Sequence, residues 1–397
     1  MALPGPLAPP QAPTGSAARV SPESKQKLHR AFERLYHLDF AQASALFREV
    51  VHAEPESAAA RAFLASAFLY ETLARQGTLQ SQLFVTSGEF LRQPRLPPDA
   101  ELERSFRQAV EEAQRVARQR LEKHPDDADG LFALGLSYGA LANYASGVEA
   151  RYLYGLRLGE KAFEHTQRLR RLHPGIGDAG IVLGVHDYVL GSLPRLHRFF
   201  LFFVGARGDR DRGMQYLEGA AQRGEYLRTY ARVLLAVARI REGQLDAAAS
   251  LLESLRGDYP NNPLILFELA RLYRQQQRYR PATQLYQELL AIVIAHPTNP
   301  RILGPEDVWL ERARSEVAAR ELDAALESLR QVEQVADADR RMLTWALLER
   351  GRIHDQRGER GAALEAYEKV IRLAADAEAR RLAAAYKKHA YVRAPGR

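Results

Sequence analysis

Apolar residues recur with one helical spacing at four places along this chain. In the last of them Ala363 is followed by Tyr367 and then by Val370, and residues with this spacing share one face of an α-helix. The four copies begin at Ala43, Ala248, Ala282 and Ala363. The second and third copies lie 34 residues apart, a period that predicts helix–turn–helix units. One unit cannot cover its own apolar face, so neighbouring units must stack.

The same register continues through the less regular middle of the chain. After Pro125 it predicts a Leu-Gly pair and then an aromatic residue, and Leu134, Gly135 and Tyr138 stand at those positions. No segment shows a convincing alternation of the kind that predicts β-strands. The predicted fold is therefore all-α: a right-handed solenoid of about eight helix pairs.

Insertions are expected in the central repeats of this solenoid. Clusters of Gly, Pro, Ser and polar residues predict irregular segments at Thr78–Pro98, Asn143–Gly159 and Gly191–Asp211. The second insertion delays the start of the following helix to about Glu160.

The composition along the chain divides it into three parts. The parts are a disordered Pro/Ala-rich leader at 1–22, helical repeats at 23–390 and a disordered tail at 391–397. The repeats comprise a degenerate region at 56–225, a regular region at 226–375 and a capping helix at 376–390.

The charge and the absence of cysteine limit the chemistry available to the chain. The net charge is +7, but acidic residues are interleaved with the arginines, a pattern typical of a solvated surface. A nucleic-acid partner is the alternative that the basic balance leaves open. With no cysteine, disulfides, thiolate catalysis and cysteine-bound zinc are excluded.

The location of the protein is predicted from its N-terminus and its apolar runs. The first residues lack the charged and apolar regions of a signal peptide, which indicates the cytoplasm. A periplasmic or exported protein is the alternative if the native start differs from Met1. The longest uninterrupted apolar run, Phe199–Ala206, is far shorter than the ~20 residues of a spanning helix, so no insertion into a membrane is expected.

The apolar skeleton resembles that of tetratricopeptide repeat proteins. The segment Gly351–Val370 is similar to the consensus of this repeat. The central segment from Leu193, an apolar run that leads into Gly-Ala-Arg-Gly-Asp-Arg and a new helix, resembles the inclusion-body-clearance (outer-membrane TPR-like) family and its bacterial relatives. Both resemblances imply a non-catalytic adaptor that binds other proteins.

No motif in the chain predicts an enzyme, a cofactor or a metal site. The string Gly175–Gly180 has the Gly-x-Gly-x-x-Gly pattern, but it follows the basic end of a helix and Pro174, where a dinucleotide fold requires a strand. We interpret it as a turn between repeats. Four histidines fall in this region, but none of them has the spacing that places two ligands on one helix face: His165, His173, His186 and His197.

A run of aromatic residues follows the Gly-x-Gly-x-x-Gly string. It contains Phe199, Phe200, Phe202 and Phe203. Aromatic side chains of this size dominate core energetics, so one interpretation is a plug that fills the core of the degenerate repeats. The alternative is a docking patch for a lipid surface or an apolar partner, bordered by basic residues.

The repeat register also predicts a row of arginines. The residue after the close-packing position is expected to face the concave groove, and this places Arg271, Arg314 and Arg352 in line. The candidate groove residues are Arg271, Arg274, Gln275, Arg314, Arg352 and Gln356. Guanidinium groups suit the capture of carboxylates, which indicates an acidic, extended partner. The structural interpretation is that each arginine pairs with the glutamate three residues before it.

The corresponding groove positions of the central repeats are apolar. They are Phe132, Leu136, Val185, Tyr188, Val237 and Ile240. We therefore predict a scaffold that binds a partner peptide or protein in its groove, without catalysis. The alternatives are a lipid-surface-associated protein that uses residues 199–204 and a nucleic-acid-binding helical repeat.

Overall fold

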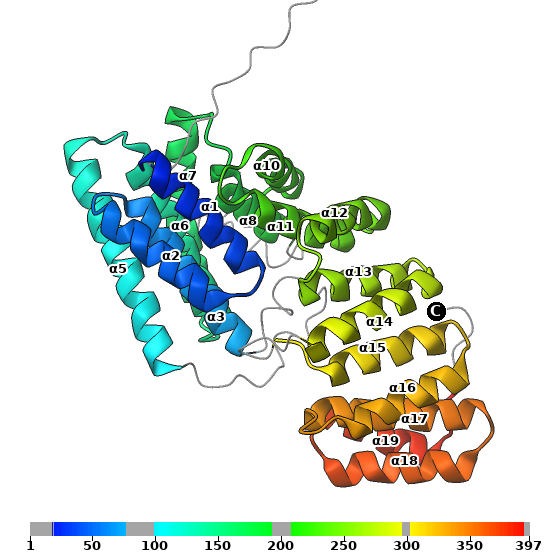
Figure 1. Cartoon of the computed structure of the whole chain (residues 1–397). Helices are drawn as coiled ribbons and strands as arrows, with labels where there is room; N and C mark the ends of the chain where they lie inside the picture. The colour runs from blue at the N-terminus through cyan, green and yellow to red at the C-terminus, as the bar shows by residue number, and fades with distance from the viewer. Residues whose placement is uncertain (1–17, 19, 77–98, 193–207, 296–301, 393–397) are drawn as a thin grey trace, which may run out of the picture. The chain divides into compact units, whose positions relative to one another are not determined.

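The computed structural model describes residues 18, 20–76, 99–192, 208–295 and 302–392 of the 397-residue chain. All regular elements in these ranges are α-helices, so the predicted all-α fold is confirmed (Figure 1). There are seventeen such helices, which corresponds to eight consecutive pairs and a terminal helix. The chain divides into two compact units, Met1–Glu242 and Gly243–Arg397.

The N-terminal unit contains nine of the described helices. They are α1 (Pro22–Tyr36), α2 (Phe40–Ala53), α3 (Ala58–Arg75), α5 (Ala100–Lys123), α6 (Ala128–Gly147), α7 (Tyr152–Leu172), α8 (Ala179–Gly191), α10 (Arg210–Arg223) and α11 (Arg228–Arg241). Successive helices pack against each other, and the first helices of adjacent pairs also meet, as α3 meets α6.

The C-terminal unit contains the remaining eight described helices. They are α12 (Leu245–Asp258), α13 (Pro263–Gln275), α14 (Tyr279–Ala295), α15 (Pro305–Ala318), α16 (Leu322–Gln334), α17 (Arg340–Gln356), α18 (Arg360–Leu373) and α19 (Ala377–Lys388). The helices α13, α15 and α17 are the first helices of three successive pairs and contact one another in that order.

Helix starts follow local chemistry. Ser21 caps α1 by accepting a hydrogen bond from the amide of Ser24, and Pro22 occupies the first helical position. Asn262 and Pro263 do the same at the start of α13. Such caps satisfy amides that have no partner within the helix.

Five pairs join their helices through a tight turn with one left-handed residue in the middle. The residues and their φ angles are Leu38 at 62°, Gly243 at 73°, Gln277 at 60°, Arg320 at 66° and Gly358 at 77°. Glycine adopts this conformation without strain, whereas other residues do not.

The predicted close-packing positions are filled as the register requires. A Cβ on Gly351 would lie 2.4 Å from a ring carbon of Tyr367, and one on Gly135 would lie 2.1 Å from the hydroxyl oxygen of Thr166. Tyr367 is completely buried between helices, as predicted. Only glycine allows these helix pairs to approach so closely.

The insertion predicted at Asn143–Gly159 is wrong. Helix α6 continues to Gly147, and α7 already begins at Tyr152. The extra turn of α6 is stabilised because Tyr144 is buried and stacks on Phe106 of α5, with ring centroids 4.7 Å apart. The other two predicted insertions and the Phe-rich run fall mostly or wholly outside the described residues.

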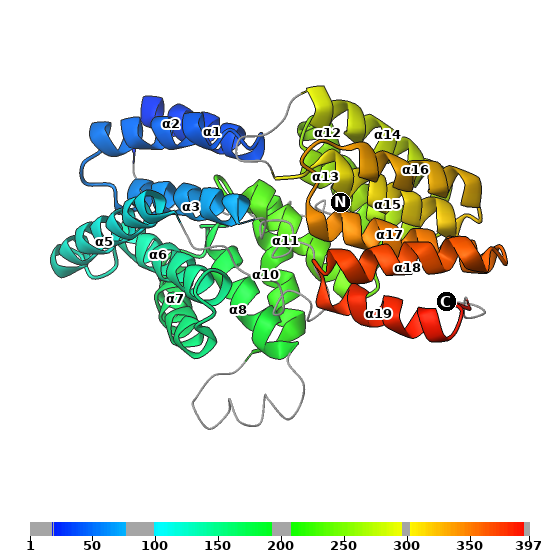
Figure 2. The ribbon, with the colours of Figure 1, turned by 90° about the horizontal axis from the view of Figure 1, so that it is seen from below.

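Contacts in the N-terminal unit are not limited to neighbouring repeats. Tyr226, just before α11, lies 5.2 Å from the ring of His29 in α1 and 5.2 Å from the ring of Phe63 in α3. Helix α11 lies beside α3 (Figure 2), and the ring of Tyr70 in α3 meets the ring of Tyr230 in α11. The start of α11, the first helix of the fifth pair, thus packs against α1 and α3, the first helices of the first two pairs.

Candidate functional site

Helices α13, α15 and α17 each present an arginine at the same position of the repeat. Each arginine pairs with the glutamate one turn earlier on its own helix, as the structural interpretation of the sequence expects. The nitrogen–oxygen distances are 3.0 Å for Arg271–Glu268, 2.6 Å for Arg314–Glu311 and 2.9 Å for Arg352–Glu349.

The same side chains also interact from repeat to repeat. Glu311 of α15 receives a hydrogen bond of 2.8 Å from Arg274 of α13 and lies 3.9 Å from Arg271. In the next step Glu349 of α17 lies 3.8 Å from Arg314. The structure therefore brings four of the predicted residues into one alternating network, which we call the arginine row: Arg271, Arg274, Arg314 and Arg352.

The arginines of the row lie outside and the glutamates beneath them. Side-chain exposure is 36% for Arg271 and 30% for Arg314, but 5% for Glu268 and 10% for Glu311. Among the described residues, Arg271, Arg274 and Arg314 each donate one hydrogen bond, although a guanidinium carries five N–H groups. The row thus presents unused donors above buried acceptors.

Neighbouring charges set the pKa values of the two buried carboxyl groups in opposite directions. Burial alone would raise the pKa of Glu311, but Arg314, Arg274 and Arg271 surround it and lower the pKa to about 2. Burial dominates at Glu268, where Arg271 is the main compensating charge, and raises the pKa to about 7. The attraction of Glu268 raises the pKa of Arg271 further above its usual value.

Aromatic rings hold the guanidinium groups in place. Arg271 lies over Phe267 at 5.9 Å, and Arg314 lies over Trp345 at 5.7 Å. Tyr286 of α14 is buried beneath the row, and its hydroxyl finds no hydrogen-bond partner among the described residues. The row is therefore fixed by contacts with its own unit before any ligand binds.

The two predicted glutamines are placed differently. Gln356 donates to the carbonyl of Arg352 on its own helix, at 3.4 Å, and Gln275 is exposed at the end of α13. Among the described residues neither amide takes part in the charged network, and the role of the two glutamines stays a prediction.

Two tyrosines that the sequence did not indicate complete the row at its far end. Tyr386 of α19 accepts a hydrogen bond from Arg352 at 3.3 Å, and its ring lies 5.4 Å from that guanidinium. Tyr391 lies 5.2 Å from the same group. Arg352 is accordingly the least exposed arginine of the row, at 18%.

The apolar positions predicted for the central groove are largely buried. Phe132 is 2% exposed because it packs on Phe63 of the preceding first helix, and Tyr188 and Val237 are also buried. Leu136 and Ile240 are half-buried, and Val185 is exposed, at 36%. An open apolar groove built from all of these positions is therefore wrong, since neighbouring repeats bury three of the six.

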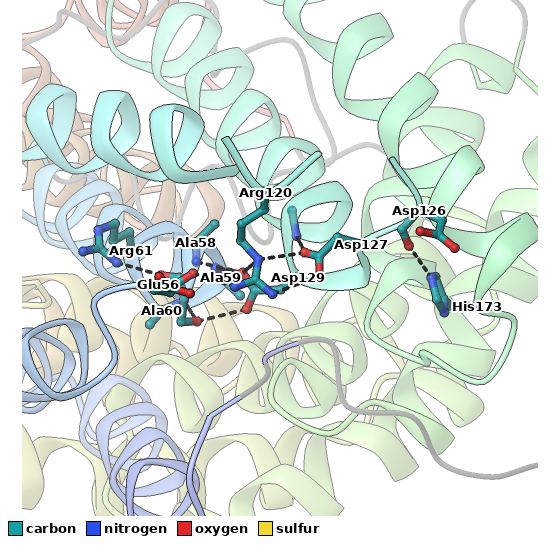
Figure 3. A network of polar contacts seen from close by, with 12 residues as sticks. Glu56, Ala58, Ala59, Ala60, Arg61, Arg120, Asp126, Asp127, Asp129 and His173 are labelled. Carbon is teal, nitrogen blue, oxygen red and sulfur yellow. Dashed lines mark hydrogen bonds and ion pairs between the residues drawn. The ribbon is translucent and has the colours of Figure 1, made fainter. Parts of the chain in front are cut away.

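A polar network in the N-terminal unit is the other charged cluster that we considered (Figure 3). Asp129 of α6 accepts hydrogen bonds from the amides of Ala58 and Ala59 at 2.7 and 3.2 Å, and it caps α3. Arg120 of α5 pairs with Asp127 at 2.8 Å. Burial raises the pKa of Asp129. Its oxygens are used by the chain itself, so we interpret this cluster as structural.

The Gly-x-Gly-x-x-Gly string is a turn between helices, as predicted. It joins α7 to α8, and both of its flanking elements are helices. Asp178 within it accepts hydrogen bonds from the amides of Tyr226 and Leu227 at 3.1 and 3.0 Å. Burial raises the pKa of this carboxyl to about 6. The string therefore anchors the start of α11.

In the part of the chain that the structure describes, no three His, Cys, Asp or Glu side chains come together as a metal site. Among the helices of the described ranges, none has both the length and the apolar composition needed to cross a bilayer.

Comparison with protein families agrees with the repeat register. Two models described as tetratricopeptide repeat match residues 205–263 and 239–293. Residues 205–293 therefore contain tetratricopeptide repeats. Repeats of this type support a role in binding other proteins. Neither model represents the inclusion-body-clearance family, so that narrower resemblance stays a prediction.

Solved helical-repeat structures resemble this chain loosely. The human IFIT1 dimer with m7Gppp-AAAA is 15% identical, with 93% of this chain and 86% of that chain covered and a TM-score of 0.44. Yeast Tom70 is 11% identical, with 88% and 85% covered and a TM-score of 0.40. Cut9 with Hcn1 is 14% identical, with 89% and 73% covered and a TM-score of 0.37. A search of curated proteins found no match.

Proposed function

We propose that this protein is a non-catalytic scaffold that holds an extended acidic segment of a partner along the arginine row. The observation that supports it most is the arrangement of the row. Carboxylates lie underneath and fix the guanidinium groups. The side chains of Arg271 and Arg314 are 36% and 30% exposed, and each donates one hydrogen bond among the described residues, which leaves further N–H donors. Such donors suit bidentate hydrogen bonds to carboxylates.

The repeat geometry gives the spacing of the ligand. Packed helices lie about 8–10 Å apart, so successive arginines of α13 and α15 are separated by about that distance. A chain in the polyproline II conformation advances about 3.1 Å per residue and completes one turn in three residues, so acidic side chains at every third position share one face and would meet successive arginines. We therefore expect a partner with this spacing to bind better than one with adjacent acidic residues.

The buried glutamates determine how this proposal must be tested. Removal of arginines alone would leave Glu311 or Glu268 as an uncompensated buried charge and would destabilise the unit. The paired variant Glu268→Gln/Arg271→Gln removes both charges together. Its matched control is Glu327→Gln/Arg330→Gln, an exposed pair on α16 with the same sequence spacing. Both variants keep the net charge of the protein.

The measurement is a fluorescence titration with a labelled peptide that carries glutamate at every third position. We expect the row variant to weaken binding about fivefold to tenfold, because charge-assisted hydrogen bonds are lost, and the control to bind as the parent does. Binding should also weaken as salt rises. Equal affinity of all three proteins would overturn the proposed site and leave the row as structural ion pairs.

Nothing in the described residues favours the other two candidate functions over this one. The lipid-surface alternative depends on Phe199–Phe203, which the described ranges do not include. The nucleic-acid alternative depends on the net charge, yet the arginines of the row already share buried carboxylates.

A further inference from the structure

The chain itself covers one end of the arginine row. After α19, residues His389–Val392 turn back over α17, and we call them the covering segment. The amide of Tyr391 donates a 2.7 Å hydrogen bond to Asp355 of α17. The ring of Tyr391 meets the ring of Tyr386 at 5.2 Å in an edge-on contact and lies beside the guanidinium of Arg352.

Asp355 holds the covering segment through a small polar network. Its carboxylate also accepts hydrogen bonds of 2.8 Å from the hydroxyl of Tyr367 and from Arg360. Burial alone would raise the pKa of Asp355, but these donors and the amide of Tyr391 lower it. Arg360 further donates to the carbonyls of Tyr386 and Lys387 at 2.7 and 2.8 Å, which fixes the end of α19.

The contacts of the covering segment differ in strength from those beneath it. The carboxylate of Asp355 is held by the buried Tyr367 and the half-buried Arg360, whereas Tyr391 contributes one amide and one ring. Val392 next to it is 82% exposed and anchors nothing. An aromatic or cation–π contact at a partly exposed site is a weak interaction. The segment can therefore leave Arg352 while Asp355, Arg360 and Tyr367 stay in place.

We propose that the covering segment is an internal competitor, which an acidic partner must displace from Arg352 before it can occupy the whole arginine row. This inference rests on the proposed function and adds its regulation. In the covered state a partner reaches Arg271, Arg274 and Arg314 only. In the open state the face of the Arg352 guanidinium that Tyr391 covers becomes accessible, and the row extends by one repeat.

The test uses the full chain with Tyr391→Ala, and Val392→Ala is the matched control because that side chain is exposed. When only a fraction of the protein is open, the apparent dissociation constant equals the intrinsic constant divided by that fraction. We expect Tyr391→Ala to bind the peptide with glutamate at every third position about threefold to tenfold more tightly than the parent. Val392→Ala should bind as the parent does.

A second pair of variants links the effect to Arg352. In the background Glu349→Gln/Arg352→Gln, the substitution Tyr391→Ala should change the affinity little, because the arginine that it uncovers is absent. An equal gain in both backgrounds would overturn the inference, as would unchanged or weaker binding by Tyr391→Ala with an unaltered thermal melt. A third outcome separates the two proposals. If the parent binds the peptide, Glu268→Gln/Arg271→Gln weakens that binding and Tyr391→Ala does not strengthen it, the internal competitor is refuted and the proposed site is not. No binding by any of these proteins refutes both proposals.

Discussion

Two glutamates of the same row show how strongly the neighbours of a residue decide its chemistry. Glu311 lies among three arginines and keeps its charge, whereas Glu268 has one close arginine and is more deeply buried. Their pKa values are about 2 and about 7, on either side of the ordinary value of 4.5. The stability of the C-terminal unit must therefore respond to pH through each of them in a different range.

The pH response of Glu268 can be measured with Glu268→Gln. Between pH 4.5 and about 7 the folded protein keeps a proton on Glu268 that the unfolded chain has lost, so this group's contribution to stability falls as pH rises. Glu268→Gln has no carboxyl group at this position, so its stability does not fall with pH for this reason. Its free energy of unfolding, relative to the parent, should increase by up to about 3 kcal/mol from pH 5 to pH 8.

Urea unfolding followed by tryptophan fluorescence gives these values. The chain has two tryptophans, Trp309 and Trp345, and both lie in the C-terminal unit. Glu311→Gln is the contrasting control. Because the pKa of Glu311 is lowered, its contribution is complete above pH 4.5, so the difference from the parent should stay constant between pH 5 and pH 8. A constant difference for Glu268→Gln would contradict the prediction.

At the scale of helices and turns, the sequence predicted most of the structure. Helices α17 and α18 lie within the region 226–375, and Tyr367 of α18 is buried as the repeat register requires. These segments are governed by local periodicity and caps, which the sequence displays directly. The error at α6 and α7 has a physical cause. Tyr144 and Phe106 stack across two helices, and no local pattern reports such a contact.

Substitution of glycine by alanine should have opposite effects in a left-handed turn and in the helix that follows it. Gly358 has φ 77°, so Gly358→Ala should destabilise the C-terminal unit by about 1 kcal/mol, because alanine is strained there. Gly361, three residues later, is inside α18 with open space around its Cβ. Gly361→Ala should stabilise by about 0.5–1 kcal/mol, since alanine favours helix. Urea unfolding through the two tryptophans measures both.

The same reasoning applies to turns that lack glycine. Gln277 and Arg320 adopt φ 60° and 66°, and both side chains are exposed. Replacement of either by glycine should stabilise the unit by about 0.5–1 kcal/mol. A loss of stability would mean that the side chain makes a contact that outweighs the backbone strain.

At the scale of the whole molecule, the N-terminal unit differs from a simple stack. Stacked repeats contact their neighbours only, and such arrays unfold in parts. Here Tyr226, at the start of α11, contacts α1 across three intervening helix pairs and α3 across two. The repeat pattern predicts the helices but not this return, because a pattern of period 34 contains no information about distant repeats.

Tyr226→Ala tests whether this contact unites the N-terminal unit. Loss of a large buried aromatic costs about 3–5 kcal/mol, and the loss should appear at both ends of the contact. Hydrogen exchange should become faster in α1 and α3 as well as in α11, while the tryptophan-reported unfolding of the C-terminal unit stays the same. Faster exchange confined to α11 would show that the repeats unfold independently.

The candidate site was predictable in part. The repeat register placed Arg271, Arg314 and Arg352 in line, because each follows a small residue at the same position of a helix. The depth of the glutamates and the cover over Arg352 depend on packing between helices that are distant in the sequence. For this reason the sequence suggested weak surface pairs, where the structure has buried carboxylates.

Because glutamate and arginine alternate along the row, the length of the row depends on the number of repeats. Each repeat brings one glutamate for the arginine before it and one arginine for the glutamate after it. A protein from which the α15–α16 pair is deleted would therefore keep every charge matched at the new junction, since Glu349 would take the place of Glu311 beside Arg271 and Arg274. Under the proposed function, the number of repeats therefore sets the length of the acidic segment that the row can bind, and a change in that number requires no new contact.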